Sequence, residues 1–107
     1  MNLNDLALST ETISVLHPTH GDVGVTVELN HPMSRAYNAA LARLVDEELP
    51  NAIVAAEAAV VAINGIDDYT HGGEYNILRD ERFFWLPMAI FAHIAKKKTD
   101  SERNLSA

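Results

Sequence analysis

The chain has 107 residues, of which 48% are hydrophobic and 21% charged, and a formal net charge of −7. These values predict one globular domain, and the acidic balance argues against a general nucleic-acid binder, because a phosphate backbone attracts basic surfaces. The lack of cysteine excludes disulfides and thiolate metal sites. Residues 1–5 lack the basic and apolar regions of a signal peptide, so we expect a cytosolic protein.

Residues 11–30 predict a β-hairpin. Residues 12–16 alternate between apolar and polar side chains, and residues 23–29 do so more clearly, as expected for half-buried strands. The loop between them, residues 17–22, contains Pro, Gly and Asp. The alternation places four apolar residues on one face of the second strand: Val23, Val25, Val27 and Leu29. This face must pack on another element or pair with another chain, since an isolated two-stranded ribbon is marginal.

Residues 31–98 predict a helical part. The first helix starts near Pro32 or Ser34, ends before Pro50, and has a core stripe of Tyr37, Leu41, Leu44 and Val45. Residues 51–63 are rich in alanine and predict a second helix, although residues 60, 61 and 63 are also compatible with a strand. Asn64 and Gly65 suit the C-terminal cap of that helix.

A polar, glycine-containing loop is expected over residues 66–75, and Asn76 or Asp80 is expected to cap the next helical stretch. Pro87 restarts or kinks that stretch. The lysines at 96–98 suit its C-terminus, and residues 99–107 form a polar tail. The whole chain, residues 1–107, is therefore predicted to be one α+β domain, predominantly α-helical, with an N-terminal hairpin followed by a small helical bundle.

An apolar run, residues 83–95 (FFWLPMAIFAHIA), contains the only tryptophan of the chain and two of its three phenylalanines. It is too short to cross a bilayer, which takes about 17–25 apolar residues, so no membrane association is expected. It is also too apolar for an ordinary surface helix. The run therefore predicts residues that belong to the core or bind a partner: Phe83, Phe84, Trp85, Met88, Ile90, Phe91 and Ile94.

Two groups of residues have the composition of a metal site. The first consists of His17, His20, Asp22 and His31, which a hairpin could bring together, and the second consists of Asp67, Asp68 and His71. Both groups also have ordinary turn composition, and that interpretation is favoured. Since the chain lacks a nucleophile elbow, a phosphate-binding glycine loop and a zinc-protease motif, we expect no enzyme, cofactor or metal.

The order of these features resembles the phage tail assembly chaperones. The resemblance spans residues 52–105: an alanine-rich stretch ending in Asn64-Gly65, a polar glycine loop, a charged turn and an aromatic helix. Its closing block is residues 75–79 (YNILR), 84–86 (FWL), 90–94 (IFAHI) and 104–105 (NL). The chain departs from the family at Ile66, where an aromatic residue is usual, and at Leu105, where phenylalanine is usual.

The resemblance implies a non-enzymatic assembly factor in the host cytoplasm that is absent from the mature virion. Such a factor binds the tape measure protein, keeps it soluble, and promotes polymerisation of tail tube subunits around it, and it can self-associate. Two alternatives remain open on the sequence. One is a structural virion component, such as a tail-completion or connector protein, and the other is a small metal-binding protein.

Overall fold

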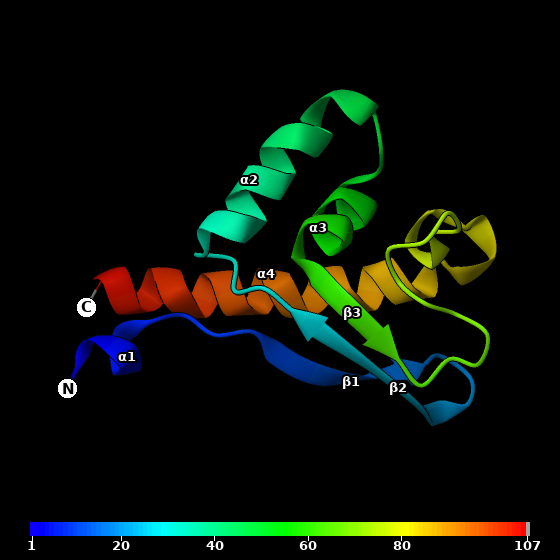
Figure 1. Cartoon of the computed structure of the whole chain (residues 1–107), viewed down its shortest axis with the longest axis horizontal. Coiled ribbons are helices and arrows are strands. Elements are labelled where there is room, and N and C mark those ends of the chain that lie inside the picture. The colour runs from blue at the N-terminus through cyan, green and yellow to red at the C-terminus, as the bar shows by residue number, and fades with distance from the viewer. Residues whose placement is uncertain (107) are drawn as a thin grey trace.

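The described part of the computed structural model, residues 1–106, combines a three-stranded antiparallel sheet with helices, and its side chains are described as far as Arg103. The strands are β1 (Glu11–His17), β2 (Gly21–Leu29) and β3 (Val60–Asn64), in that order across the sheet. The helices are α1 (Leu3–Leu6), α2 (Arg35–Leu44), α3 (Asn51–Ala59) and α4 (Trp85–Ser106). Short 3₁₀ turns form η1 (Val45–Glu47), η2 (Ile77–Arg79) and η3 (Glu81–Phe83). The predicted α+β class is confirmed (Figure 1).

The predicted hairpin is present, but its second strand is irregular. Ser14 pairs with Thr26 and Leu16 pairs with Asp22, so β2 carries extra residues at this point. Gly24 adopts a φ of +81° within this irregularity, a conformation that costs glycine little. The shift turns Val23 outward, where it is 44% exposed, while Val25, Val27 and Leu29 stay buried. The prediction that Val23 shares their face is therefore wrong.

The second predicted helix is too long, because α3 ends at Ala59 and the chain continues as strand β3. β3 pairs antiparallel with β2 and buries Val60 and Ile63. β2 thus becomes the central strand, and the pairing supplies the partner that an isolated hairpin needs. Gly65 does not cap a helix; it follows β3 with a φ of +90°, and a Cβ there would lie 1.9 Å from the Gly24 carbonyl oxygen.

The N-terminus of α2 is set by Ser34, whose side chain accepts a hydrogen bond from the Tyr37 backbone N–H at 3.2 Å. Tyr37 is buried, and Leu41 and Leu44 pack against the core, as the helical spacing predicts. Val45 does not belong to this stripe, because the chain tightens into η1 there and leaves Val45 71% exposed. α3 contributes mainly alanines to the core, which lets it lie close to its neighbours.

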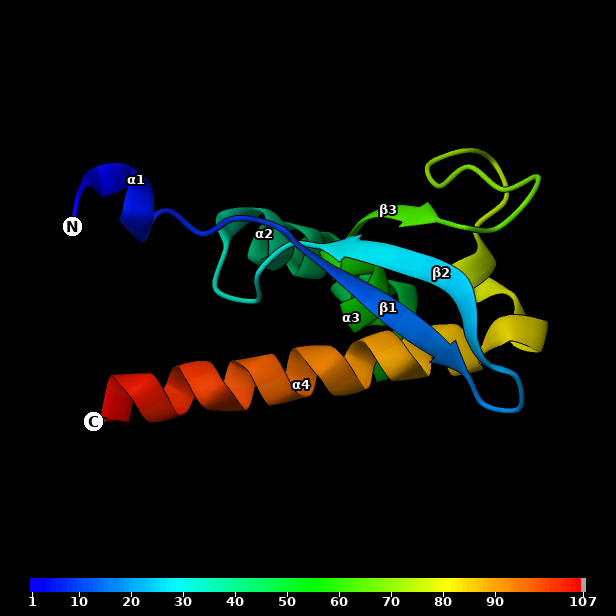
Figure 2. The same ribbon diagram turned by 90° about the horizontal axis from the view of Figure 1, so that it is seen from below.

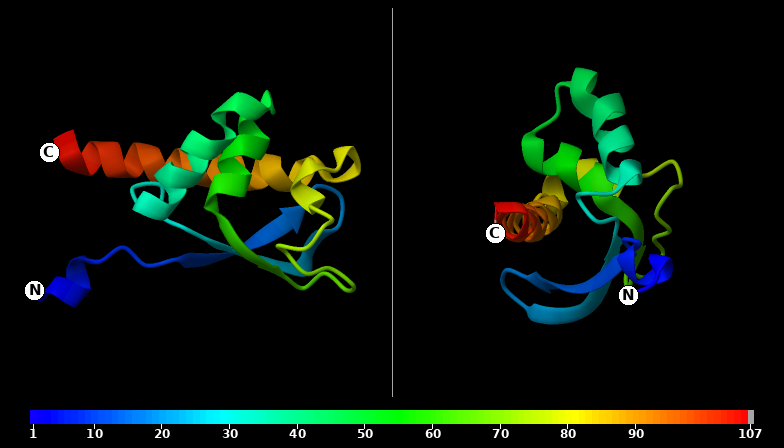
Figure 3. Two further views of the ribbon diagram at one scale, coloured as in Figure 1. Left: turned by 45° about the horizontal axis from the view of Figure 1, so that its top comes forward. Right: turned by 90° about the vertical axis from the view of Figure 1, so that its left-hand side faces the viewer.

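Helix α4 is the longest element, and it runs alongside β1 and α3. Viewed along α4, helices α2 and α3 lie above it and the β1–β2 hairpin lies below it (Figure 3). Pro87 lies in its first turn, where its missing N–H breaks no intrahelical hydrogen bond, and it is buried. The helix does not end at the lysines as predicted: it continues to Ser106 through the segment expected to be a polar tail. The Asn104–Leu105 side chains lie outside the described residues.

Both ends of the described chain project in the same direction. Figures 1 and 2 show α1 and the C-terminal turns of α4 extending together beyond the sheet. Helix α1 buries none of its side chains. Among residues 1–106, no helix is sufficiently long and apolar to span a membrane.

Candidate partner-binding surface

The helical period divides the apolar run into a buried face and an exposed one. Leu86, Ile90 and Ile94 recur every four residues and are at most 3% exposed. A second stripe, which we call the outer stripe, consists of Phe84, Met88, Ala92 and Ala95. Phe84 directly precedes α4, and its carbonyl accepts the first helical hydrogen bond from Met88, so it extends this face. Phe84 is 40% exposed and Met88 is 45% exposed, which makes the outer stripe an apolar face turned to solvent.

The seven residues predicted to be core or partner-binding therefore fall into three groups. Ile90 and Ile94 belong to the core, and Phe84 and Met88 lie on the outer stripe. The remaining three are half-buried and pack against the core: Phe83, Trp85 and Phe91. The position of each follows from its place in the turns of the helix.

Half-buried Trp85 is held by the hairpin turn. Its ring lies edge-on to the His17 ring, with centroids 5.0 Å apart, and His17 stacks on His20 at 4.6 Å. Next to it, the Arg82 guanidinium lies 5.1 Å from the centre of the Phe83 ring. The contact between Trp85 and His17 places the start of α4 against the tip of the β1–β2 hairpin and so orients the outer stripe.

A second apolar surface lies in the N-terminal segment, which sequence reasoning missed. We call residues 1–8 the arm; it contains Met1, Leu3, Leu6 and Leu8, which are 96%, 85%, 63% and 54% exposed. Asn2 caps the short helix α1 through a hydrogen bond from the Asp5 N–H. The signal that could have revealed the arm was present: three leucines occur in eight residues ahead of the first strand, with no second apolar segment nearby in sequence to cover them.

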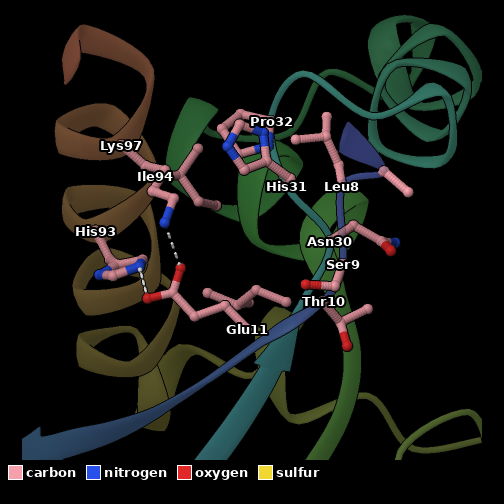
Figure 4. A pocket seen from close by; sticks show the side chains of 12 residues that line it. Leu8, Ser9, Thr10, Glu11, Asn30, His31, Pro32, His93, Ile94 and Lys97 are labelled. Atoms are coloured by element: carbon pink, nitrogen blue, oxygen red, sulfur yellow. Dashed lines mark hydrogen bonds and ion pairs between the residues drawn. The ribbon is translucent and has the colours of Figure 1, made fainter. Parts of the chain in front are cut away.

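Two cavities follow one another along α4. The first, of about 340 Å³, lies between residues 7–11, the segment after β2, and His93, Ile94 and Lys97 of α4 (Figure 4). The second, of about 360 Å³, lies between residues 13–16 of β1 and Ala89, Ala92 and His93. His93 borders both. Volumes of this size are at the lower end of those of ligand sites.

An ion pair connects α4 to β1 where the two cavities meet. Lys97 Nζ donates to Glu11 Oε2 at 2.9 Å, and His93 Nε2 lies 3.4 Å from Glu11 Oε1 (Figure 4). The Lys97 ammonium lowers the pKa of the Glu11 carboxyl by stabilising its charged form. His93 Nε2 is buried, and its contact with Glu11 is not aligned as a hydrogen bond. The ion pair therefore ties the start of β1 to the helix.

The predicted histidine and aspartate residues of the hairpin shape its turn instead of converging on one point. His17 Nδ1 accepts hydrogen bonds from the Thr19 and His20 N–H groups, at 3.0 and 3.1 Å. Asp22 Oδ1 accepts from the Gly24 N–H at 2.9 Å. His31 caps a separate turn by accepting from the Met33 N–H, and burial lowers its pKa. Within residues 1–106, three or more possible metal-binding side chains do not gather anywhere.

The second predicted acidic group has a similar structural role. Asp68 occupies a left-handed turn with a φ of +61°. His71 Nδ1 hydrogen-bonds the Tyr69 hydroxyl at 2.8 Å, and burial lowers the pKa of His71. These residues thus organise the loop that precedes η2.

The charged turn before α4 is partly exposed and forms ion pairs with two other elements. Arg79 reaches two carboxylates: it forms a short ion pair with Glu57 of α3 and donates to Glu47 of η1 at 2.6 Å. Both carboxylates raise the pKa of Arg79. Asn76 also donates to Glu57, at 3.0 Å, and caps η2 as predicted. These bonds attach the polar loop to α3 and position the entry to α4.

The comparisons with known proteins add no relative: no protein-family model, curated protein or solved structure matches the chain. The functional assignment therefore depends on the surface itself.

Proposed function

We propose that the protein is an assembly chaperone of the phage tail type, which binds the tape measure protein and keeps it soluble while tail tube subunits polymerise around it. The observation that carries the proposal is the outer stripe, where Phe84 and Met88 are each at least 40% exposed on a well-packed helix. Aromatic residues and methionine are enriched in protein interfaces. The order of motifs along residues 52–105 supports the same proposal.

The physical chemistry of this surface suits a transient client. A long helical client exposes apolar stripes before assembly, and an apolar helix face covers such a stripe by helix packing. Methionine is flexible and adapts to different client side chains. The net charge of −7 helps to keep the chain and its complex soluble. Binding takes place in the host cytoplasm, and the chaperone leaves before the virion is complete.

The proposal predicts that a long helical protein is encoded next to this chain. The test is co-expression with that protein, followed by a pull-down and a measurement of soluble client. We expect the native chain to raise the soluble client and the double variant Phe84→Ser/Met88→Ser to abolish this effect. Phe84 and Met88 are 40% and 45% exposed, so each change should lower stability by about 1–2 kcal/mol, and circular dichroism checks that the double variant folds. The matched control is Val45→Ser, which removes an apolar side chain that is 71% exposed on another face.

Two results would count against the proposal. One is a client that stays equally insoluble and unbound in the presence of the native chain. The other is recovery of this chain in stoichiometric amounts from purified particles, which would favour a structural virion component.

A further inference from the structure

Strand β1 has a free edge, because it pairs with β2 on one side and forms the border of the sheet on the other. The Asn30 N–H donates to the Ala59 carbonyl, so the backbone N–H and C=O groups of Asn30 are directed toward β3. Along β2 these backbone groups are directed alternately toward β3 and toward β1. Val27 and Leu29 are therefore the residues of β2 that bond to β1. Their partners are Ile13 and Glu11. The backbone groups of Thr12 and Ser14 consequently point away from the sheet.

These outward groups are unpaired in the described structure. Among residues 1–106, neither a backbone nor a side-chain hydrogen bond reaches the outer side of Thr12 or Ser14. Natural sheets usually protect such an edge with proline, with lysine or with a covering segment. Residues 12–16 of β1 (TISVL) contain neither of these residue types. The residues of β1 themselves therefore do not protect this edge.

The cavity of about 360 Å³ lies directly beside this edge. It is lined by four consecutive residues of β1, 13–16, and on the other side by Ala89, Ala92 and His93 of α4. Because consecutive strand residues point to opposite faces, a cavity that touches all four of them borders the strand edge. Ala92 belongs to the outer stripe, so the exposed helix face and the open strand edge meet in this cavity.

We propose that an extended segment of a partner polypeptide adds to β1 as a fourth strand in this cavity. Its backbone would pair with Thr12 and Ser14, and its alternate apolar side chains would lie against Ala92 and Met88. This is strand addition at a sheet edge, in which the backbone supplies affinity and the side-chain pockets supply selectivity. The inference rests on the proposed function only in taking the client as the source of the segment.

The charges beside the cavity define the occupant further. Lys97 is already paired with Glu11, but Lys96 and Lys98 form no ion pair within the part of the chain that the structure describes. Lys96 is exposed and follows Ala92 by one helical turn, so its charge lies on the face of α4 that borders the cavity. An acidic residue at the corresponding end of the segment would complement this charge.

A second copy of this chain is the poorer occupant. The inward-facing side chains of its own β1, Ile13 and Val15, are already packed against its own core, and Val15 is 2% exposed. Such a strand has one largely uncovered apolar side chain, Leu16, which is 62% exposed, so it offers less apolar surface to the outer stripe than a segment with free alternate side chains. The client segment brings such free side chains.

The experiment uses a fluorescein-labelled peptide of four Thr-Val repeats followed by two aspartates, measured by fluorescence anisotropy with the full chain. Two analogues are N-methylated, one at the threonines and the other at the valines. A strand in a sheet edge pairs through only one of its two sides. We therefore expect one analogue to lose binding and the other to keep it, with the protein unchanged.

The protein variants test the same edge. Ser14→Pro removes an outward N–H and should weaken binding of the peptide about tenfold. Ser14→Thr keeps the N–H and should bind as the native chain does. Circular dichroism checks that both variants fold, and Thr12→Pro replaces Ser14→Pro if it does not.

Three outcomes would overturn the inference. They are absence of peptide binding, equal behaviour of the two N-methylated analogues, and a native dimer that Ser14→Pro converts to a monomer, which would make a second copy the occupant. If the native chain keeps the co-expressed client soluble while the peptide fails to bind, the inference fails and the proposed function stands. If the peptide binds and the client stays insoluble, the proposed function fails instead.

Discussion

Replacing Gly65 with alanine tests the close approach that joins β3 to the irregular part of β2. Gly65 has a φ of +90°, and a left-handed conformation costs alanine about 1–2 kcal/mol. The new Cβ would also lie 1.9 Å from the Gly24 carbonyl oxygen, which belongs to the backbone and cannot rotate away. Separating the strands there sacrifices one or two hydrogen bonds, at about 1 kcal/mol each. The expected loss is therefore about 3 kcal/mol in the free energy of unfolding.

A loss of this size is large against the 5–15 kcal/mol that typically stabilises a domain. The measurement is urea unfolding followed by circular dichroism. Gly72→Ala is the matched control, because Gly72 has a φ of +100° and a Cβ there would meet nothing within 4 Å. The control isolates the conformational cost, about 1–2 kcal/mol. If both variants lose the same free energy, the contact with Gly24 does not constrain the fold and the reasoning is refuted.

The remaining predictions concern the buried and charged faces of α4. Ile90→Ala should lower the free energy of unfolding by about 2–5 kcal/mol, because Ile90 is fully buried. Met88 is 45% exposed, so Met88→Ala should lower it by only about 1 kcal/mol. Urea unfolding compares the two. Glu11→Gln should remove a pH-dependent contribution to stability. Lys97 lowers the pKa of Glu11 below 4.5, so that contribution is present above pH 4.5 and is lost as the pH falls through the lowered pKa. Both side chains are partly exposed, so the contribution is below about 1 kcal/mol. When the free energy of unfolding is measured from pH 3 to 7, it should fall less toward acid pH in the variant than in the native chain. An equal fall in both would contradict the prediction.

The parts of the fold that could be predicted from sequence are those where one periodicity dominates. The alternation of apolar and polar residues predicted β1 and β2, and the spacing of Tyr37, Leu41 and Leu44 predicted α2. Each pattern is visible in the sequence because one face of the element is buried. The caps at Ser34 and Asn76 were also predictable, since their side chains bond to backbone only two or three residues away. Local chemistry was sufficient in each case.

The errors occurred where distant residues decide the structure. Residues 60–63 follow an alanine-rich helix without a break in hydrophobicity, and they become β3 because the inner side of β2 needs a partner. Val23 turns outward because of the register shift at Gly24, which the strict alternation of its neighbours conceals. Helix α4 continues beyond its lysines because the following residues are compatible with a helix.

The candidate surface was predicted in part. The sequence marks the apolar run as core or partner-binding but cannot divide it, because the division depends on which face of α4 packs on the sheet. Once Leu86, Ile90 and Ile94 are fixed inward by β1 and α3, the positions of Phe84 and Met88 follow from the helical period. The arm and the free edge of β1 are exposed because no other part of the fold covers them. A local sequence pattern does not contain that information.

Three uncovered features border the same helix: the outer stripe, the open edge of β1 and the arm. The two cavities connect them along α4, since His93 borders both and residues 7 and 8 of the arm line the first. The other long helices, α2 and α3, are on the opposite side of α4 from the hairpin (Figure 3). Substitutions should therefore separate by location. Those on the exposed flank of α4 and at the outward residues of β1, Thr12 and Ser14, should change client binding with little change in stability, whereas those between α3 and α4 should change stability first.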